Sequence, residues 1–369
     1  MRILFISHSY PPTLGGVETQ NYNLSKGLSK IAKVNTIANT KGKKWLGVFL
    51  FFATFKAFTS MKKFDACLLG SGVVAPVGWF LKIFHRKKKF FCIVHGLDVT
   101  YANRKGILPF VYKNVNIRGL KKMSHLFMVG NATIEEAVKI GINREKCTFI
   151  PNGVNPDELI EKHSRQELSQ LCGKNVKEKI VILRHGRFVS HKGTSWFISE
   201  VMPLLGENVF LIASGNRVGS KTAGDKDDFL QCEQAIVDKH LEKRVCLLPC
   251  LPWKDVLTLF NTVDIVVSPN VKIPGTMEGF GINVIEAGAC GRVILASNLE
   301  GLADAVKDGQ NGFLVESENV SQWVEKINAV IVAKDDLKRM FSIRISNYVQ
   351  ENFSWNRICV RYLDEMKKY

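Results

Sequence analysis

The stretch KIVILRHGR, residues 179 to 187, decides how the second half of the chain is built. It is a continuous apolar, β-branched run that ends in polar residues, which is typical of a strand buried in a parallel sheet. It follows a polar segment from 155 to 178. Five more runs come after it: VFLIAS (209 to 214), RVCLLP (244 to 249), DIVVSP (264 to 269), RVILAS (292 to 297) and NGFLVE (311 to 316).

The same rhythm fills the first half, with helical patterns between several of the runs. These runs are RILFIS (2 to 7), VNTIA (34 to 38), DACLLG (65 to 70), FFCIVH (90 to 95), HLFMVG (125 to 130) and CTFIP (147 to 151). A chain of 369 residues suits two domains. We therefore predict two parallel α/β domains in tandem, residues 1–165 and 176–351, with a cleft between them.

The C-terminal region predicts helices over 319–350 and 354–367, the second with Ser354 as its N-cap. The second helix repeats apolar residues at helical spacing, so this face must pack on something. Its apolar residues are Trp355, Ile358, Cys359, Tyr362, Leu363 and Met366.

Composition places the chain among globular proteins, with 46% apolar and 23% charged residues. Nine cysteines without a CxxC pair indicate a reducing compartment, and the N-terminus shows no signal-peptide pattern, so a cytoplasmic location is expected. The net charge of +17 is uneven: through residue 175 there are 27 Lys and Arg against 10 Asp and Glu, and after it 24 against 24. Such a basic half attracts a polyanion, whether phospholipid, nucleic acid or a phosphorylated substrate.

One segment of the first half, KGKKWLGVFLFFATFKAFTSMKK (41 to 63), is apolar and aromatic between basic flanks. Its apolar part is shorter than the roughly 20 residues that cross a bilayer. It is either a helix buried under the sheet or a helix in the membrane interface, where lysines meet anionic lipid. WFLKIFHRKKKFF (79 to 91) repeats the pattern and supports the second interpretation.

The stretch MEGFGINVIEAGACG, residues 277 to 291, predicts a loop followed by a helix that begins near Gly281. The loop comes after a strand, and ligands of parallel α/β sheets bind beyond the carboxyl ends of the strands. Gly279 and Gly281 allow backbone N–H groups to approach a ligand, and the helix start adds partial positive charge. This predicts an anion site suited to phosphate.

Two acids flank that turn. A carboxylate can accept hydrogen bonds from a vicinal diol, so Glu286 suits the hydroxyls of a ribose and Glu278 those of a second sugar. Taken alone, the spacing favours two solvated glutamates near a helix start, the first of them stabilised by the helix dipole. RHGRFVSHKG (184 to 193) adds Arg187 and Lys192 at the same strand ends, where two cations could neutralise a departing diphosphate. Together the four predict a nucleotide-sugar site.

Other motifs are weaker. SYPPTLGGVETQ (9 to 20) places Gly15 and Gly16 between a strand and a helix, as a second anion cradle or a plain turn. His95, at the end of a strand in VHGLDV (94 to 99), could donate to a sugar hydroxyl or serve only the structure. DKDD (225 to 228) contains a DxD pattern, for which a solvated turn is favoured over a cation site. We expect no metal and no cofactor.

These motifs, in this order along essentially the whole chain, resemble glycosyltransferase family 4. They are GGVE near the start, HGLD (95 to 98), IPNGV (150 to 154), GR with HKG downstream, and EGFGINVIE (278 to 286). The resemblance implies retaining enzymes of the GT-B fold, in which two Rossmann-like domains face each other across a cleft. It also implies that the C-terminal helix, within 352–369, crosses back to the first domain.

The resemblance also implies roles. The acid matching Glu286 binds the donor ribose, and the acid matching Glu278 contacts the transferred hexose with the amides of Gly279, Phe280 and Gly281. Residues matching Arg187 and Lys192 hold the diphosphate, the glycine matching Gly16 offers it an amide, and the histidine matching His95 lies by the sugar. The base lies between loops matching 214–217, with Gly215 and Asn216, and 250–252, with Leu251. Asn216 and Arg217 stand where many members have a glycine, which leaves the base open.

The sequence thus predicts a metal-independent, retaining hexosyltransferase at the inner membrane surface, in glycolipid or surface-polysaccharide assembly. A UDP-sugar is the first expected donor and GDP-mannose the second, with a glycan or lipid-linked acceptor and an anionic membrane as partners. A GT-B epimerase or glycan phosphorylase is the alternative enzyme. A basic nucleic-acid-binding protein is an alternative of another class, but no RRM, KH or zinc-finger signature supports it and no nucleic-acid partner is expected.

Overall fold

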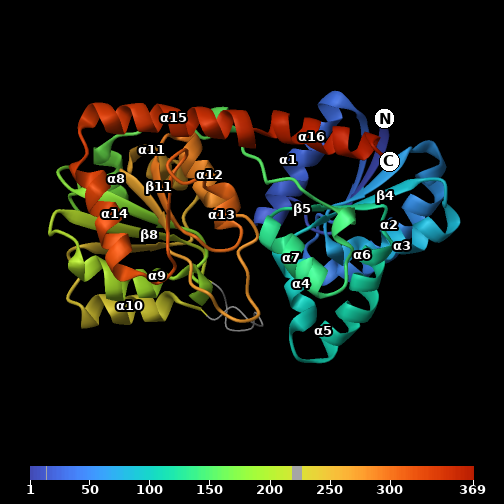
Figure 1. Ribbon diagram of the computed structural model, residues 1–369, viewed down its shortest axis with the longest axis horizontal. Helices are drawn as coiled ribbons and strands as arrows, with labels where there is room; N and C mark the ends of the chain where they lie inside the picture. The colour runs from blue at the N-terminus through green and yellow to red at the C-terminus, as the bar shows by residue number, and fades with distance from the viewer. Residues whose placement is uncertain (14, 218–226) are drawn as a thin grey trace. The chain divides into compact units, whose positions relative to one another are not determined.

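The computed structural model describes residues 1–13, 15–217 and 227–369, which form two domains (Figure 1). The first domain is Met1–Gly153 together with Trp355–Tyr369, and the second domain is Val154–Ser354. Each contains a six-stranded parallel sheet in its described residues. All twelve strands predicted from the sequence are therefore confirmed, with ends that shift by at most two residues.

The strand order is β2-β1-β3-β4-β5-β6 in the first domain and β12-β11-β10-β7-β8-β9 in the second. Neighbouring strands in both sheets are parallel, so their carboxyl ends share one edge, and the strand order in each sheet reverses direction along the chain. The strands are β1 (Arg2–Ser7), β2 (Lys33–Ala38), β3 (Ala66–Leu69), β4 (Lys89–Val94), β5 (His125–Met128), β6 (Cys147–Phe149), β7 (Ile180–His185), β8 (Val209–Gly215), β9 (Val245–Pro249), β10 (Ile265–Ser268), β11 (Val293–Ser297) and β12 (Phe313–Val315).

Helices connect the strands. In the first domain they are α1 (Gly16–Ile31), α2 (Leu46–Ser60), α3 (Ala75–Phe84), α4 (Gly96–Thr100), α5 (Ile107–Tyr112), α6 (Arg118–Lys122), α7 (Asn131–Lys139) and α16 (Trp355–Lys367). In the second domain they are α8 (Arg165–Cys172), α9 (Thr194–Trp196), α10 (Phe229–Asp238), α11 (Trp253–Thr262), α12 (Ile282–Ala289), α13 (Leu302–Ala305), α14 (Val320–Val332) and α15 (Asp335–Phe353).

The single helix predicted over 319–350 is two helices, α14 and α15, and this part of the prediction is wrong. The backbone is extended at Ala333 and Lys334, which ends the hydrogen-bond ladder of α14. Asp335 and Asp336 then occupy the first turn of α15, where their negative charges are favourable to the helix dipole.

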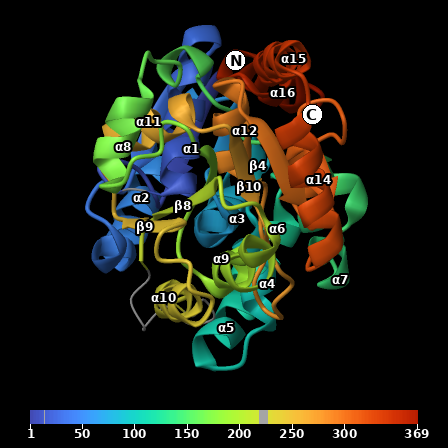
Figure 2. The same ribbon diagram turned by 90° about the vertical axis from the view of Figure 1, so that its left-hand side faces the viewer.

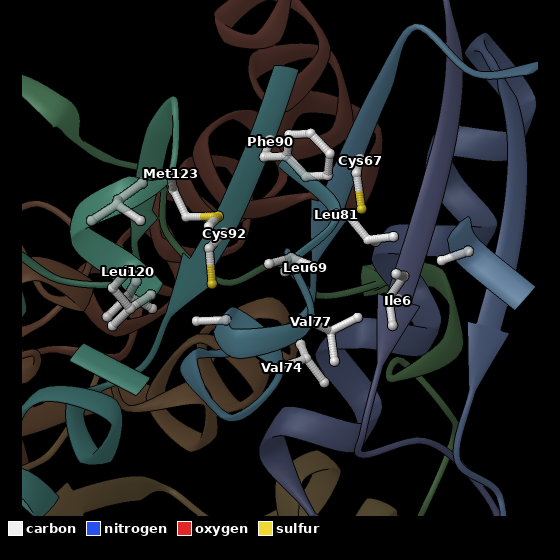
Figure 3. Close-up of a cluster of buried hydrophobic side chains, with 14 of the residues drawn as sticks. Ile6, Cys67, Leu69, Val74, Val77, Leu81, Phe90, Cys92, Leu120 and Met123 are labelled. Atoms are coloured by element: carbon white, nitrogen blue, oxygen red, sulfur yellow. The ribbon is translucent and has the colours of Figure 1, made fainter. Parts of the chain in front are cut away.

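The core of the first domain has two sides because side chains alternate along each strand. Leu4, Ile6, Cys67 and Leu69 belong to the side covered by α2, α3, α6 and α7. Figure 3 shows Ile6, Cys67 and Leu69 in this cluster. Their neighbours in the strands point to the other side, against α1 and α16. Both faces of the sheet are therefore buried, as the continuous apolar runs predict.

The last helix packs on the first domain, and this prediction is confirmed. The six apolar residues of α16 named above are all buried, and they join the core side that contains Leu24 and Leu28 of α1. The helices α1 and α16 lie side by side (Figure 1). A Cβ at Gly27 would overlap the Sγ of Cys359, so the close approach of the two helices depends on that glycine.

The second sheet is also covered on both faces. Figure 2 shows α8 and α11 on one side of its strands and α14 on the other. The helix α12 packs on β10 and β11 and is covered in turn by α15. This arrangement fixes the start of α12 next to the carboxyl end of β10.

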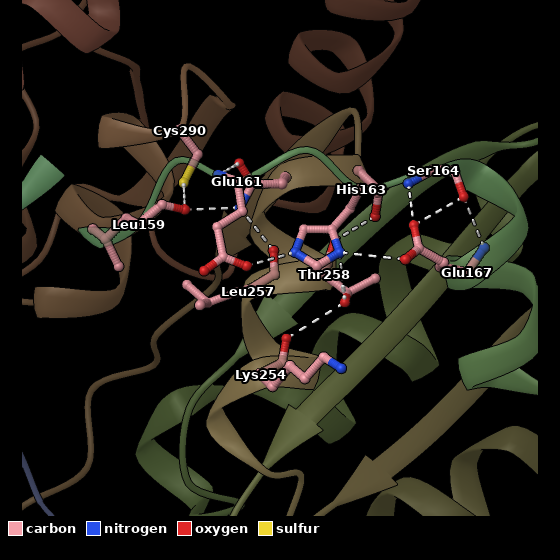
Figure 4. A network of polar contacts seen from close by, with 11 residues as sticks. Leu159, Glu161, His163, Ser164, Glu167, Lys254, Leu257, Thr258 and Cys290 are labelled. Carbon is pink, nitrogen blue, oxygen red and sulfur yellow. Dashed lines mark hydrogen bonds and ion pairs between the residues drawn. The ribbon is translucent and has the colours of Figure 1, made fainter. Parts of the chain in front are cut away.

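Residues 154–165, which the sequence places with the first domain, lie with the second. Val154 N–H donates to the carbonyl oxygen of Phe353 at 2.8 Å. The carbonyl oxygen of Leu159 accepts from Asn261 Nδ2 at 2.8 Å and from Cys290 Sγ, and His163 Nδ1 lies 3.2 Å from Thr258 Oγ1 (Figure 4). The boundary therefore falls between Gly153 and Val154, because these polar contacts attach the linker to α11 and α12.

Replacing Ile358 with Ala should destabilise the first domain by about 2–5 kcal/mol, because it leaves a cavity in a fully buried position. Val360, on the same helix, is 46% exposed. Val360→Ala should change the free energy of unfolding by less than about 0.5 kcal/mol. Urea unfolding followed by circular dichroism measures both. Equal losses in the two variants would contradict the packing of α16 described here.

Candidate functional site

A cluster of predicted site residues lies at the carboxyl ends of the second sheet, in the loops after β7, β8 and β10. These loops meet backbone to backbone. Gly215 has φ 144°, and a Cβ there would overlap the carbonyl oxygen of Gly186; Gly193 has φ 64°, and a Cβ there would overlap that of Pro269. Both positions therefore need glycine. The loop after β7 is held against its two neighbours.

An ion pair joins the loop after β7 to the loop after β10. Lys192 Nζ pairs with Glu278 Oε2, and the two side chains are only 12% and 13% exposed. Asn270 Nδ2 donates to the same carboxylate oxygen at 3.0 Å. Burial would raise the pKa of Glu278, but the charges of Lys192 and His191 and these hydrogen bonds outweigh it and lower the pKa to about 2. Glu278 is therefore ionised at neutral pH.

The turn that follows Glu278 is braced by the loop after β11. Glu278 N–H donates to Glu300 Oε2 at 2.7 Å, and Glu300 also pairs with Lys272. Gly301 N–H donates to the carbonyl oxygen of Glu278 at 3.1 Å, and a Cβ on Gly301 would overlap the backbone of Gly279. The path of the turn is thus set by backbone contacts on both sides.

Phe280 anchors the same turn. Its side chain is 1% exposed and packs edge-on against Phe353 of α15, with ring centroids 5.6 Å apart. Gly281 then takes a left-handed conformation, with φ 86°, and caps α12. The predicted helix start near Gly281 is confirmed. The ring of Phe280 therefore lies in the core, and the first N–H groups of α12 follow the turn directly, as in helix starts that bind anions.

Glu286 lies at the start of the second turn of α12. Its side chain is partly buried, and burial raises the pKa of its carboxyl to about 7. Among the residues that the structure describes, none makes a hydrogen bond or an ion pair with this carboxyl. A buried acid with a raised pKa and open acceptor positions is typical of a ligand site.

Arg184 fixes the loop that carries Arg187. Its buried guanidinium donates to the carbonyl oxygens of Gly186 and of Arg187, the latter at 2.9 Å. Burial lowers the pKa of Arg184 to about 10, so it stays charged at neutral pH. The side chain of Arg187 is exposed in the same loop. The structure thus brings Lys192 into contact with Glu278, while Arg187 lies nearer the surface.

His185, before that loop, is kept neutral. Burial, and then the charges of Arg184 and Lys192, lower its pKa to about 3. Its Nδ1 lies 2.8 Å from Ser214 Oγ, and its carbonyl oxygen accepts from Asn283 Nδ2 at 3.0 Å. These contacts connect the ends of β7 and β8 to the first turn of α12.

The residues predicted to border the base lie in adjacent loops. Phe188 N–H donates to the carbonyl oxygen of Asn216 at 3.0 Å, and Cys250 N–H donates to that of Gly215 at 3.0 Å. Leu251 follows directly and is half-buried. The loops after β8 and β9 are therefore hydrogen-bonded neighbours, although no contact in the structure tests the role of Leu251.

Two residues of the DKDD stretch, Asp225 and Lys226, lie outside the described residues. The other two, Asp227 and Asp228, make contacts with protein groups. Asp227 accepts from Phe229 N–H at 3.1 Å and pairs with Arg217 at 3.2 Å. Asp228 accepts from the N–H of Ser195 at 3.1 Å and from its hydroxyl at 2.7 Å. Within residues 1–13, 15–217 and 227–369, no group of three His, Cys, Asp or Glu side chains is arranged to hold a metal ion.

The first domain has a separate cluster at the ends of β1 and β4. Gly16 begins α1, and a Cβ on Gly15 would overlap the Glu18 carboxylate. His95 caps α4: its N–H donates to Asp98 Oδ2 at 2.9 Å, and its Nε2 lies 3.3 Å from the carbonyl oxygen of Gly70. Burial lowers the pKa of His95, with Asp98 opposing it, so its ring is neutral at neutral pH.

Sequence reasoning missed several members of both clusters. In the first domain these are Glu18 and His8. The Nδ1 of His8 lies 2.8 Å from Ser71 Oγ, and burial lowers the pKa of His8. In the second they are Asn270 and Glu300. His8, Asn270 and Glu300 each come within a few residues of the end of a strand, so the rule that located Glu278 could also have found them.

Comparisons with known proteins bear on this site. Residues 166–344 match the family model of glycosyl transferases group 1. The N,N'-diacetylbacillosaminyl-diphospho-undecaprenol alpha-1,3-N-acetylgalactosaminyltransferase of Campylobacter jejuni is 24% identical over 279 residues, 74% of this chain and 69% of that protein. The D-inositol 3-phosphate glycosyltransferase of Mycobacterium marinum is 29% identical over 198 residues, 54% of this chain but only 40% of that protein.

Solved structures extend the likeness to the whole chain. Anabaena HepE, solved with UDP-glucose, has a TM-score of 0.76 at 19% identity and full coverage of both chains. Sucrose-phosphate synthase from Thermosynechococcus elongatus has a TM-score of 0.77 at 17% identity, over 100% of this chain and 99% of that chain. At such identity the likeness shows the fold, which is GT-B. Residues 166–344, just under half of the chain, are similar to the group 1 glycosyltransferases.

Proposed function

We propose that this glycosyltransferase moves a hexose from a UDP-sugar to a hydroxyl of a glycan or lipid-linked acceptor, with retention of configuration and without a metal ion. The observation that carries the proposal is the meeting of Lys192 and Glu278 beside the glycine turn that begins α12. Glu286 lies further along the same helix. A cation, the backbone amides of the turn and two carboxylates match the diphosphate, hexose and ribose of one donor.

The ion pair defines how the donor is bound. In this proposal the diphosphate takes Lys192 as its partner, and the released Glu278 carboxylate accepts hydrogen bonds from hexose hydroxyls. Because Glu278 is ionised, it is an acceptor at both oxygens. The amides of Gly279 and Gly281 add donors for oxyanions. A sugar donor that carries phosphates and hydroxyls therefore gives Lys192 and Glu278 each a new partner when the ion pair separates.

The transfer itself follows from the same groups. The bond between the anomeric carbon and the diphosphate oxygen breaks, and the acceptor oxygen bonds to that carbon on the same face. The acceptor proton passes to the departing diphosphate oxygen, so no protein nucleophile is required. Lys192 and Arg187 stabilise the negative charge that develops on the leaving group. Asp227 and Asp228 are engaged by protein groups, which supports a reaction that uses no metal.

Relatives support the choice of substrates. HepE of Anabaena has been solved with UDP and with UDP-glucose, which favours a UDP-sugar over GDP-mannose, the second candidate. The name of the Campylobacter relative describes transfer to a diphospho-undecaprenol-linked sugar. Together with the basic first half of the chain, this supports a lipid-linked acceptor and a place in glycolipid or surface-polysaccharide assembly.

A panel of UDP-, GDP-, ADP- and dTDP-sugars tests the function. The proposed donor should raise the melting temperature and, with a lipid-linked acceptor, release its nucleotide diphosphate, with EDTA leaving turnover unchanged. The anomeric configuration of the product, read by NMR, tests retention. An epimerised nucleotide sugar without transfer would identify an epimerase. A loss of turnover in EDTA that added metal restores would overturn the metal-independent mechanism.

Glu286→Gln tests the ribose contact through its pH dependence. Ribose hydroxyls need the ionised carboxylate, so wild-type affinity for UDP should fall as the pH drops below about 7, the pKa of Glu286. At pH 8 the variant should bind about tenfold to a hundredfold more weakly, the loss expected for hydrogen bonds to a charged group. Calorimetry at several pH values gives the ratio of the two affinities, which cancels titration of UDP itself. A ratio that does not change with pH would remove Glu286 from the ribose.

Lys192→Met tests the phosphate contact. The variant should bind UDP about tenfold to a hundredfold more weakly than the wild type and bind uridine, which lacks phosphates, equally well. Lys272→Met is the matched control, because Lys272 pairs with Glu300 at the rim of the same site. The double variant Lys192→Met, Glu278→Gln avoids leaving a buried unpaired carboxylate. A loss of uridine binding equal to that of UDP would place Lys192 away from the phosphates.

A further inference from the structure

The outward side of α2 departs from an ordinary protein surface. The helix packs on the sheet through Phe49, Ala53 and Ala57. Its opposite side should be polar in a globular protein. Instead, Phe51 is 79% exposed and Phe55 is 65% exposed, and Val48, Phe52 and Phe58 are exposed beside them.

The neighbouring helix α3 extends the same surface. It packs against α2, and its exposed Phe80, Ile83 and Phe84 join that stripe. The ring of Phe58 lies 6.3 Å from that of Phe80 and 5.4 Å from that of Phe84, centroid to centroid. The two helices therefore share one continuous aromatic face, defined as Val48, Phe51, Phe52, Phe55, Phe58, Phe80, Ile83 and Phe84. A patch of this kind marks an interaction site.

Basic residues surround the aromatic face. Exposed lysines stand at both ends of α2, and a basic run follows α3. These residues are Lys43, Lys44, Lys56, Lys62, Lys63, Arg86, Lys87 and Lys89. Lys88 of the same run has a different task, since its Nζ donates to the carbonyl oxygen of Phe64 at 2.6 Å. Lys41 lies over the ring of the exposed Trp45 at the start of α2, 4.7 Å from its centroid.

Acidic residues are scarce throughout this region. Between residues 19 and 134 the chain contains only two, Asp65 and Asp98. Asp65 pairs with Arg2 at 2.8 Å, and Asp98 is buried, where it accepts from His95 N–H and Tyr112. The potential around the aromatic face is therefore positive, and its occupant must be anionic as well as apolar.

We propose that the aromatic face of α2 and α3 docks onto an anionic lipid bilayer, with α2 lying flat in the interface. Aromatic rings enter the boundary between head groups and acyl chains, and lysines at both ends of the helix reach anionic head groups at the same depth. A second copy of the chain does not fit, because pairing would bring two lysine-ringed faces together. No helix in the described part of the chain is long and apolar enough to span a membrane.

The proposed docking is inferred only from the exposed residues of α2 and α3. The use of a lipid-linked acceptor, in contrast, rests on the proposed function. Docking would hold the first domain at the surface where such an acceptor is anchored. Docking would therefore let the enzyme reach the acceptor by diffusion within the plane of the membrane rather than through the solution. Failure of docking would leave UDP binding, which uses the second domain, unchanged, so the two proposals fail separately.

Vesicle flotation tests the docking. The full chain should float with vesicles that contain phosphatidylglycerol and much less with pure phosphatidylcholine. Phe51→Ser, Phe55→Ser should reduce binding at least tenfold. Arg86→Gln, Lys87→Gln, Lys89→Gln should reduce it by roughly a hundredfold at low salt, given the contribution of each basic residue near an anionic surface. The circular dichroism spectrum and the melting temperature of each variant, compared with those of the wild type, confirm that the first domain is folded.

Matched controls come from the second domain. Leu204→Ser, Val237→Ser removes two exposed apolar residues and Lys239→Gln, Lys243→Gln, Lys307→Gln removes three exposed lysines, and neither should change binding. Brominated lipid should quench Trp45 fluorescence in the wild type, with the quenched component absent in Trp45→Phe. Equal binding to neutral and anionic vesicles, or wild-type binding by the Phe51, Phe55 variant, would overturn the proposal. So would self-association that the same variant abolishes.

Discussion

The ion pair between Lys192 and Glu278 is the interaction on which the candidate site depends. It connects two loops that are 86 residues apart in the chain, and the two side chains are almost enclosed. Burying one of these charges alone would be costly, so each holds the other in the site. The amide of Asn270 and the braced backbone of Glu278 keep the carboxylate in place. The pair is thus a preformed arrangement of one donor group and one acceptor group.

Glycine makes that arrangement possible. The strands of the second sheet end close together, and their loops can meet only where no side chain intervenes. Gly193, Gly215 and Gly301 each lie against the backbone of another loop, where a Cβ would overlap it. At these contacts the loops approach each other through backbone N–H and C=O groups rather than through side chains. These backbone contacts position the start of α12.

The strands and the site motifs could be predicted because their signals are local. An apolar run predicts its strand, and the strand-end rule places Glu278 and Lys192 on one edge. The contact between these two residues could not be derived from spacing, because it depends on how far each loop folds back. The linker at 154–165 gave no signal for its domain either. The linker is attached through backbone carbonyl oxygens such as that of Leu159. Every residue has such an oxygen, so the sequence does not reveal which of them accept a hydrogen bond.

The side of α2 that faces outward was unpredictable for a different reason. Periodicity locates the buried side of a helix only when the other side is polar, and α2 is apolar all round. The sequence therefore left a buried helix and an interfacial helix both open. In the structure the buried residues of α2 are Phe49, Ala53 and Ala57, with Leu50 partly buried against the same core, while most of the phenylalanines of α2 are exposed.

The two domains also differ in how they use charge. The second half of the chain balances its acids and bases, and its site lysine is neutralised by Glu278. A polyanion that separated Lys192 from Glu278 would leave the carboxylate without a partner. A ligand that offers phosphate to the lysine and hydroxyls to the acid replaces both halves of the ion pair. The first half has almost no acids near its exposed lysines, so it attracts any anionic surface over a distance. The charges that would suit a specific ligand and those that would attract an anionic surface therefore lie in different domains.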